Sequence, residues 1–255
     1  MPIHKTEAIV LKKMDFRETS VIAHFFTREF GKINGILKGI RKDPRKFSSS
    51  VDLCSHNEII FYRSRTSDLH LVSHCDMKNG FASGRQDMIK TVVASLMMEL
   101  VHSVMGQEDK NEGVFDLALE CLRQLNTTDT PEKILTIFKI KILTLSGFRP
   151  HFDSCVSCQS KIMGETRFSL AMGGLLCSRC FSKDTKARVI FRGTVATLLH
   201  IQRNDFKNTL TLGMNPEIKK ELNLVLDAFL NFHLEKDFRA QRVLNQLTQP
   251  VLCAT

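Results

Sequence analysis

The chain has 255 residues, enough for one large domain or two to three smaller ones. Its 43% hydrophobic content argues against global disorder, and 36 Lys and Arg against 27 Asp and Glu give a formal net charge of +9. That charge favours an anionic partner, with nucleic acid first and an acidic protein segment or an anionic membrane second. No secretory signal and no apolar run near ~18 residues is visible, so we expect a cytoplasmic address.

Residues 1–80 predict five short strands separated by turns. The strand-forming runs cover 6–11, 19–27, 32–40, 55–62 and 69–75. The third run alternates imperfectly, with Ile33, Gly35 and Leu37 on one face. Five strands in about 80 residues are typical of a small barrel, and the oligonucleotide-binding (OB) barrel is a leading candidate.

Helical spacing of apolar residues begins after Gly84. It predicts helices over 86–105 and 114–122, and a third from Pro131 to Leu145, which Gly147 ends. Further helices are expected over 192–203 and 216–234. We therefore predict an α+β multidomain chain: an OB barrel over 1–80, a helical domain over 81–150 and 191–255, and an inserted cysteine ribbon over 151–190.

Four cysteines form two Cys-x-x-Cys pairs separated by 18 residues, at Cys155, Cys158, Cys177 and Cys180. Two such turns brought together place four thiolates at tetrahedral corners, which suits one structural Zn²⁺ without an open coordination position. Two disulfides would be unusual in a reducing compartment, and ribbon spacing argues against a redox pair. The spacing alone leaves an iron–sulfur cluster open. Cys54, Cys75, Cys121 and Cys253 are scattered, which is typical of small hydrophobic residues or a free thiol.

The charge of the barrel segment is concentrated in one stretch. Residues 1–80 carry 14 basic and 9 acidic residues, and residues 28–46 alone carry seven basic and two acidic ones. The seven are Arg28, Lys32, Lys38, Arg41, Lys42, Arg45 and Lys46. Clustered on one face, they could follow a phosphate backbone, and Phe rings could stack on bases. A solvated basic loop that binds nothing is the competing interpretation.

The catalytic motifs that we sought are absent. The chain contains no Gly-x-x-x-x-Gly-Lys, Gly-x-Gly-x-x-Gly, His-Glu-x-x-His or Gly-x-Ser-x-Gly. The histidines are dispersed, and the acidic residues near the predicted strands are too scattered to suggest a two-metal nuclease. A binding protein is therefore favoured over an enzyme.

Several stretches together resemble the RecO family of bacterial recombination mediators. They are Glu-Ala-Ile-Val-Leu-Lys-Lys-Met-Asp-Phe-Arg-Glu from Glu7, Thr-Arg-Glu-Phe-Gly-Lys from Thr27, Lys-Gly-Ile-Arg-Lys from Lys38, Leu-Ser-Gly-Phe-Arg-Pro from Leu145 and Phe-Arg-Ala-Gln-Arg-Val-Leu from Phe238. The last stretch resembles the closing basic helix of that family. Residues 15–20 lack the small residues expected in the turn between the first two strands.

The resemblance implies an N-terminal OB barrel and a helical domain interrupted by a zinc ribbon. It also implies binding of single- and double-stranded DNA, strand annealing, partnership with RecR, and loading of RecA onto DNA coated by single-strand-binding protein (SSB). No covalent catalysis is implied, and a nucleoid-associated place in the cytoplasm would follow. The acidic SSB tail would dock on the helical domain, where Lys139, Lys141 and Arg149 are candidates. An RNA-binding ribbon protein, a nuclease and a protein adaptor are the alternatives.

Overall fold

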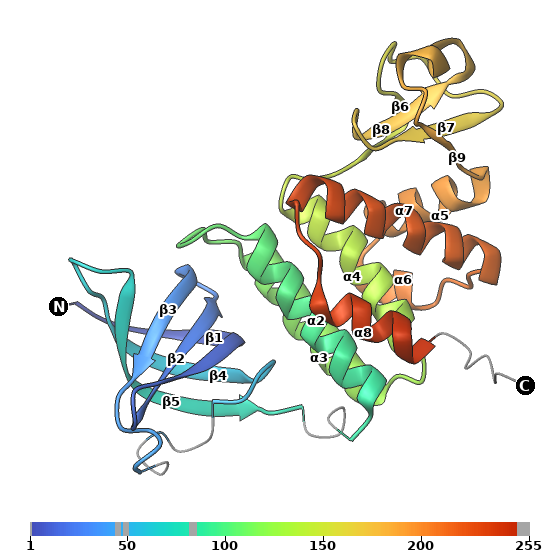
Figure 1. The fold of residues 1–255 in the computed structure, drawn as a ribbon. Coiled ribbons are helices and arrows are strands. Elements are labelled where there is room, and N and C mark those ends of the chain that lie inside the picture. The colour runs from blue at the N-terminus through green and yellow to red at the C-terminus, as the bar shows by residue number, and fades with distance from the viewer. Residues whose placement is uncertain (1, 44–46, 48–50, 82–85, 249–255) are drawn as a thin grey trace, which may run out of the picture. The chain divides into compact units, whose positions relative to one another are not determined.

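The computed structural model describes residues 2–43, 47, 51–81 and 86–248 (Figure 1). Within these ranges the chain forms two compact units. The first contains residues up to Leu135 together with those from Phe238 onward, and the second contains Thr136–Asp237. No helix of the described part combines the length and the apolar character needed to cross a bilayer.

Five strands of the first unit close into a barrel in the order β1-β2-β3-β5-β4 (Figure 1). The strands are β1 (Ile3–Phe16), β2 (Ser20–Thr27), β3 (Gly31–Leu37), β4 (His56–Tyr62) and β5 (Leu69–Asn79). All neighbouring pairs are antiparallel except β3 and β5, whose parallel pairing closes the barrel. The predicted five-stranded OB barrel followed by helices is thus confirmed, with a first strand longer than expected.

The residues of β3 alternate between buried and half-buried positions, as the sequence of the third strand predicted. Ile33, Gly35 and Leu37 are buried on β3, whereas the residues between them are half-buried. Gly35 faces the interior at a crowded point, because an added Cβ would lie 2.5 Å from Val72 Cγ2 and 2.9 Å from Phe25. The small residue therefore lets the large Phe25 ring fill the core.

Three helices continue the first unit. They are α2 (Met88–Val104), α3 (Glu112–Thr127) and α8 (Arg239–Thr248), and the first turn of α4 (Pro131–Leu145) also belongs here. Asp87 caps α2 by accepting from the N–H groups of Ile89 and Lys90, at 2.8 and 3.1 Å. Asn111 caps α3 in the same way through Val114 N–H at 3.0 Å. Both α3 and α8 pack on α2.

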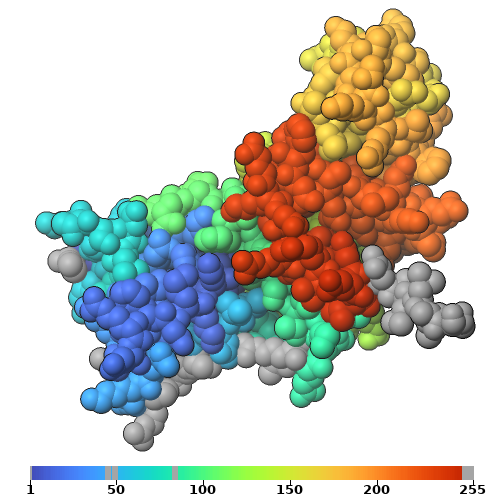
Figure 2. All heavy atoms as spheres, viewed as in Figure 1, coloured from blue at the N-terminus to red at the C-terminus, as the bar shows by residue number. Residues whose placement is uncertain are grey.

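The second unit holds the rest of α4, a small sheet and three more helices. The sheet has the order β6-β8-β7-β9, formed by β6 (His151–Cys155), β8 (Gly174–Cys177), β7 (Thr166–Ser169) and β9 (Arg188–Val189). The 3-10 helix η2 (Ser178–Lys183) follows β8, and α5 (Arg192–Arg203), α6 (Phe206–Leu210) and α7 (Pro216–Leu234) complete the unit. The atoms of the ribbon, coloured yellow to orange, form one continuous mass in Figure 2.

Candidate metal centre and nucleic-acid interface

Four cysteine sulfurs meet at one end of the small sheet. Cys155 ends β6, Cys158 lies in the following turn, Cys177 ends β8 and Cys180 lies in η2. All four sulfurs lie within 4.8 Å of one another, and those of Cys158 and Cys177 are 3.7 Å apart. Metal–sulfur bonds of about 2.3 Å in a tetrahedron place sulfurs about 3.8 Å apart. The four side chains could therefore hold one metal ion, and the distances exceed the ~2.05 Å of a disulfide.

The backbone around the cysteines brings the sulfurs together. Gln159 N–H donates to Cys155 C=O at 2.8 Å, with Gln159 in the left-handed region at a φ of 60°. Val156 N–H donates to Leu175 C=O at 2.7 Å, which joins the first cysteine turn to β8. Gly174 permits this approach, because a Cβ there would lie 2.7 Å from His151 O. These contacts hold the first Cys-x-x-Cys turn against β8, which places the sulfurs of Cys155 and Cys158 near that of Cys177.

The surroundings act differently on the four thiols. At Cys180 a hydrogen bond from Ser157 lowers the pKa, but burial and the neighbouring cysteines raise it to about 11, whereas polar groups favour the thiolate, the form that binds metals, at Cys158. The Ser160 hydroxyl lies 3.0 Å from Cys158 Sγ and 3.9 Å from Cys177 Sγ. Hydrogen bonds from Ser160, first from its side chain and then from its backbone, lower the pKa of the Cys158 thiol to about 6. Cys177 N–H also points at Cys155 Sγ, at 3.5 Å. The donor set therefore fits a thiolate-bound ion with no open position for a substrate.

Three of the expected DNA-binding residues share the segment that follows β3. Lys38, Arg41 and Lys42 are all exposed, whereas Arg45 and Lys46 lie outside the described residues. Arg41 N–H donates to Thr19 C=O at 3.0 Å, so this segment lies against the β1–β2 turn. The Arg41 guanidinium is 3.6 Å from Asp15, but its side chain keeps 46% of its surface exposed. These basic groups are therefore accessible on one side of the barrel.

The other two expected residues, Arg28 and Lys32, are held by intramolecular contacts. The Arg28 guanidinium pairs with Glu7 at 3.2 Å and with Asp116 of α3 at 2.6 Å. The Lys32 ammonium donates to the carbonyls of His102 and Met105, at 2.8 and 2.7 Å. These carbonyls lie at the negative end of α2, where a cation is stabilised. Both side chains thus fasten the barrel to helices, and the structure does not group them with Lys38, Arg41 and Lys42.

Three basic residues, two on β1 and one in the β1–β2 turn, were not among the predicted DNA-binding residues. Lys12, Lys13 and Arg17 are exposed, and Arg17 C=O lies 3.5 Å from the Arg41 guanidinium. Lys12 is paired in register with His24 of β2, whose pKa is lowered by burial and then by the nearby charge of Lys12. The signal that could have found them is the Lys-Lys pair directly after the first predicted run.

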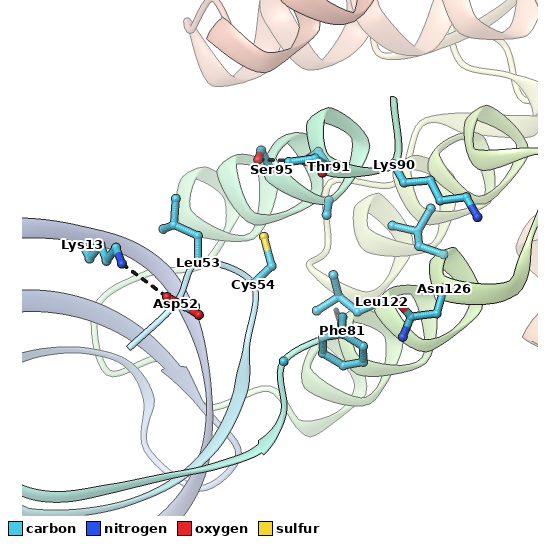
Figure 3. A pocket seen from close by; sticks show the side chains of 13 residues that line it. Lys13, Asp52, Leu53, Cys54, Phe81, Lys90, Thr91, Ser95, Leu122 and Asn126 are labelled. Atoms are coloured by element: carbon cyan, nitrogen blue, oxygen red, sulfur yellow. Dashed lines mark hydrogen bonds and ion pairs between the residues drawn. The ribbon is translucent and has the colours of Figure 1, made fainter. Parts of the chain in front are cut away.

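A cavity of about 310 Å³ lies beside the barrel, next to Lys13 (Figure 3). Asp52, which pairs with Lys13 at 3.5 Å, Leu53 and Cys54 line it from the barrel side. Its opposite wall comes from α2 and α3, where Lys90 and Leu122 contribute. The lining is largely apolar, with a lysine at each side. Cys75 and Cys121 are buried as expected, whereas Cys253 lies outside the described residues.

The three residues expected to meet an acidic tail do not form one surface. Lys139 is 2% exposed and pairs with Asp227 of α7 at 2.5 Å. Burial lowers the pKa of Lys139, against the opposing effect of Asp227. The Lys141 ammonium donates to Asn204 C=O, and Arg149, whose side chain is 42% exposed, pairs with Asp153 at 2.5 Å. Only Arg149 keeps a substantial exposed fraction.

The fold and the cysteine cluster define a multidomain protein built from an OB barrel, a helical region and a four-cysteine ribbon. Family models for the N-terminal part of recombination protein O and for its C-terminal part match residues 1–81 and 85–242. The chain therefore belongs to the recombination protein O family, whose work is DNA repair by recombination.

Similar proteins carry the name DNA repair protein RecO. The chain is 30% identical to that of Syntrophus aciditrophicus over 251 residues, covering 96% of each chain. It is 31% identical to the protein of Alkaliphilus metalliredigens, covering 91% of this chain and 94% of the relative. A 28% identical relative from Acetivibrio thermocellus is matched over 92% of this chain and 93% of its own. The expected family resemblance is confirmed over nearly the whole length.

Proposed function

We propose that the protein is a non-catalytic recombination mediator that binds single- and double-stranded DNA and anneals complementary strands. Together with RecR it helps load RecA onto single strands coated by SSB. The observation that carries the proposal is the exposed group of Lys38, Arg41 and Lys42 beside the β1–β2 turn of an OB barrel. Such a group neutralises phosphates, which lets two strands approach each other.

Salt dependence tests the proposed DNA surface. We expect the triple variant Lys38→Ala, Arg41→Ala and Lys42→Ala to bind single strands more weakly. The plot of log affinity against log salt should become shallower by about 0.7 per lost phosphate contact, or about 2 in total. Fluorescence anisotropy of a labelled oligonucleotide at several salt concentrations measures this slope. The control replaces Lys207, Lys220 and Lys236 of the second unit, which removes the same charge; an equal loss in both variants would contradict the proposed surface.

The mediator activity is tested by annealing of complementary oligonucleotides, with and without SSB and RecR. We expect the protein to accelerate annealing and the Lys38, Arg41 and Lys42 variant to lose most of that acceleration. Competition between single-stranded DNA and structured RNA distinguishes an RNA-binding function. A protein adaptor would show no salt-dependent DNA binding at all.

The four cysteines bind one structural Zn²⁺ in this proposal. The ion would cross-link β6, β8 and η2, and its binding free energy would contribute to the folding of the ribbon. Metal analysis of the purified protein is expected to give one zinc per chain. Iron with visible charge-transfer absorption, or four titratable thiols without metal, would reject zinc.

The acidic tail of SSB is expected to dock on the helical part of the chain. Arg149 is the member of the predicted group whose exposed side chain is suited to a tail carboxylate. Lys139 contributes to the fold instead, because it is enclosed with Asp227. Binding of a labelled tail peptide to Arg149→Ala, compared with Arg179→Ala in the ribbon, tests this assignment. Loss only in the first variant supports it, and unchanged binding in both removes Arg149 from the site.

A further inference from the structure

A second pocket opens at the end of the barrel where β3 begins, the opposite end of that strand from Lys38. It has a volume of about 180 Å³, whereas one ordered water needs only about 10–15 Å³. The β2–β3 turn, the end of β4, the start of β5 and the loop between α2 and α3 all contribute. The lining residues are Glu29, Phe30, Ile33, Phe61, Arg63, His70 and Glu108.

Aromatic rings form the floor of this pocket. Phe61 is 1% exposed, and its ring centre lies 5.4 Å from that of Phe30, edge to face, and 5.6 Å from that of His70, stacked. His4 lies against both phenylalanines, at 4.7 and 5.4 Å. The face of an aromatic ring carries negative electrostatic potential. A floor of this kind attracts cations more strongly than neutral groups.

Glu108 reaches the rim because its loop is joined to β3. Glu108 N–H donates to Lys32 C=O at 2.9 Å, and Glu108 has a φ of 54°, a rare backbone conformation for this residue type. Gly31 makes this approach possible, because a Cβ there would lie 2.3 Å from Asp109 O. The Glu108 carboxylate pairs with Arg63 and lies 3.5 Å from His70 Nε2. The loop thus supplies one carboxylate that is already neutralised.

Glu29 supplies a second carboxylate, and its charge, after that of Glu112, helps to raise the pKa of Lys110. One of its oxygens accepts a hydrogen bond from the Thr6 hydroxyl, and this fixes the side chain at the rim. Asp109 and Glu112 follow in the same loop and at the start of α3, with Lys110 between them paired to Glu112 at 2.8 Å. The two lining carboxylates, Glu29 and Glu108, outnumber the one lining guanidinium, Arg63, so the charge of the pocket favours a cationic guest over a phosphate.

We propose that this pocket binds an arginine side chain presented by a partner protein. A guanidinium is planar, so it can stack on the Phe30 ring while donating to the free oxygen of Glu29. The pocket uses none of the residues assigned to DNA binding on the exposed turn, so this inference stands apart from the proposed DNA surface.

The full-length protein with ¹³C-labelled phenylalanine rings provides the test. N-acetyl-arginine amide is titrated while the ring signals of Phe30 and Phe61 are followed by NMR, with assignment from Phe30→Leu. We expect half-saturation in the millimolar range, typical of one cation in a partly open site. Glu29→Gln should weaken binding about tenfold, whereas Glu165→Gln in the ribbon, far along the chain from the pocket residues, should leave it unchanged.

Two further probes separate the alternatives. N-acetyl-glutamine amide, which is neutral, should bind at least tenfold more weakly than the arginine probe. Equal binding of the neutral probe, equal binding to Glu29→Gln, or tighter binding of guanosine monophosphate would overturn the proposal, the last by indicating a nucleotide site. If Glu29→Gln fails to fold, the arginine affinity of Phe30→Leu replaces it, read from the Phe61 signal. Oligonucleotide affinity is expected to be unchanged in all these variants.

Discussion

Single charged residues serve two different purposes in this chain, and burial separates them. Lys139 is enclosed between α4 and α7 and is neutralised by Asp227, whereas Lys38 and Lys42 are exposed. A buried ammonium is tolerated only when it is paired, because an isolated charge inside a protein is strongly destabilising. The family resemblance made Lys139 a candidate for tail binding, and its position in the sequence did not reveal that Asp227, 88 residues further along the chain, would pair with it in the interior.

Removal of one partner of this pair should therefore be costly. We expect Asp227→Asn to lower the free energy of unfolding by about 3 kcal/mol, since the buried Lys139 ammonium then loses its carboxylate counter-ion. Urea unfolding followed by circular dichroism measures the loss. The double variant Lys139→Met with Asp227→Leu should recover most of the stability, because two apolar side chains can replace a buried pair. A double variant as unstable as the single one would contradict this account.

At the scale of elements, the lysines at the two ends of β3 have different environments. Lys32, near its start, donates to the last carbonyls of α2, while Lys38, just past its end, is exposed. The alternation of β3 and the Pro131 start of α4 were predictable, because both are local properties of the sequence. The partners of Lys32 were not, since they lie 70 and 73 residues away along the chain. The cysteine spacing, in contrast, indicated the four-cysteine cluster directly.

The lysines at the two ends of β3, Lys32 and Lys38, should therefore respond to substitution in opposite ways. We expect Lys32→Gln to lower the free energy of unfolding by about 1–3 kcal/mol, because two helix-end carbonyls lose a charged donor. Its salt slope for DNA binding should stay unchanged. Lys38→Gln should keep the stability within about 0.5 kcal/mol and make the slope shallower by about 0.7. Urea unfolding and anisotropy on the same two preparations measure both quantities, and a reversed pattern would refute the division.

The junction between the barrel and α3 should be sensitive to acid. The hydrogen bond from Lys78 lowers the pKa of Glu7 in the folded state, with burial opposing it. The folded protein thus binds the Glu7 proton less readily than the unfolded chain, so the stabilisation is complete above about pH 4.5 and is lost as the pH falls through the folded pKa. We expect Glu7→Gln to lose less stability between pH 6 and pH 3.5 than the natural chain, by up to about 1 kcal/mol. Glu18→Gln, in the exposed β1–β2 turn, serves as the control in the same urea series.

At the scale of the whole molecule, the two units depend on different sources of stability. The first has a barrel core of fully buried apolar side chains, including Phe25, Phe61 and Ile59. The ribbon in the second has a small buried cluster in which three of the five members are cysteines. Phe152 and Phe168 add a stacked pair of buried rings that reaches Phe229 of α7, so the cysteine end of the ribbon is the place where a bound metal would add a cross-link. Metal is therefore expected to matter for one unit and not for the other.

Metal removal should loosen the ribbon selectively. We expect chelation, or Cys158→Ser, to abolish hydrogen-exchange protection of the Val156 and Cys177 amides while the barrel strands stay protected. Affinity for single-stranded DNA should change less than twofold, because the proposed DNA surface lies in the other unit. Hydrogen-exchange mass spectrometry of the metal-loaded and metal-free protein measures this. Cys54→Ser is the matched control and should keep full protection; a barrel that loses protection with the ribbon would contradict independent stabilisation.

The chain leaves the first unit within α4 and returns to it only at α8, which packs on α2. During synthesis the residues of the second unit, 136–237, must all be made before α8 can reach its place. At about 5–20 residues per second this delay is roughly 5–20 s. Throughout that interval the nascent chain exposes the side of α2 that α8 later covers, so the newborn protein should depend on chaperones until α8 leaves the ribosome.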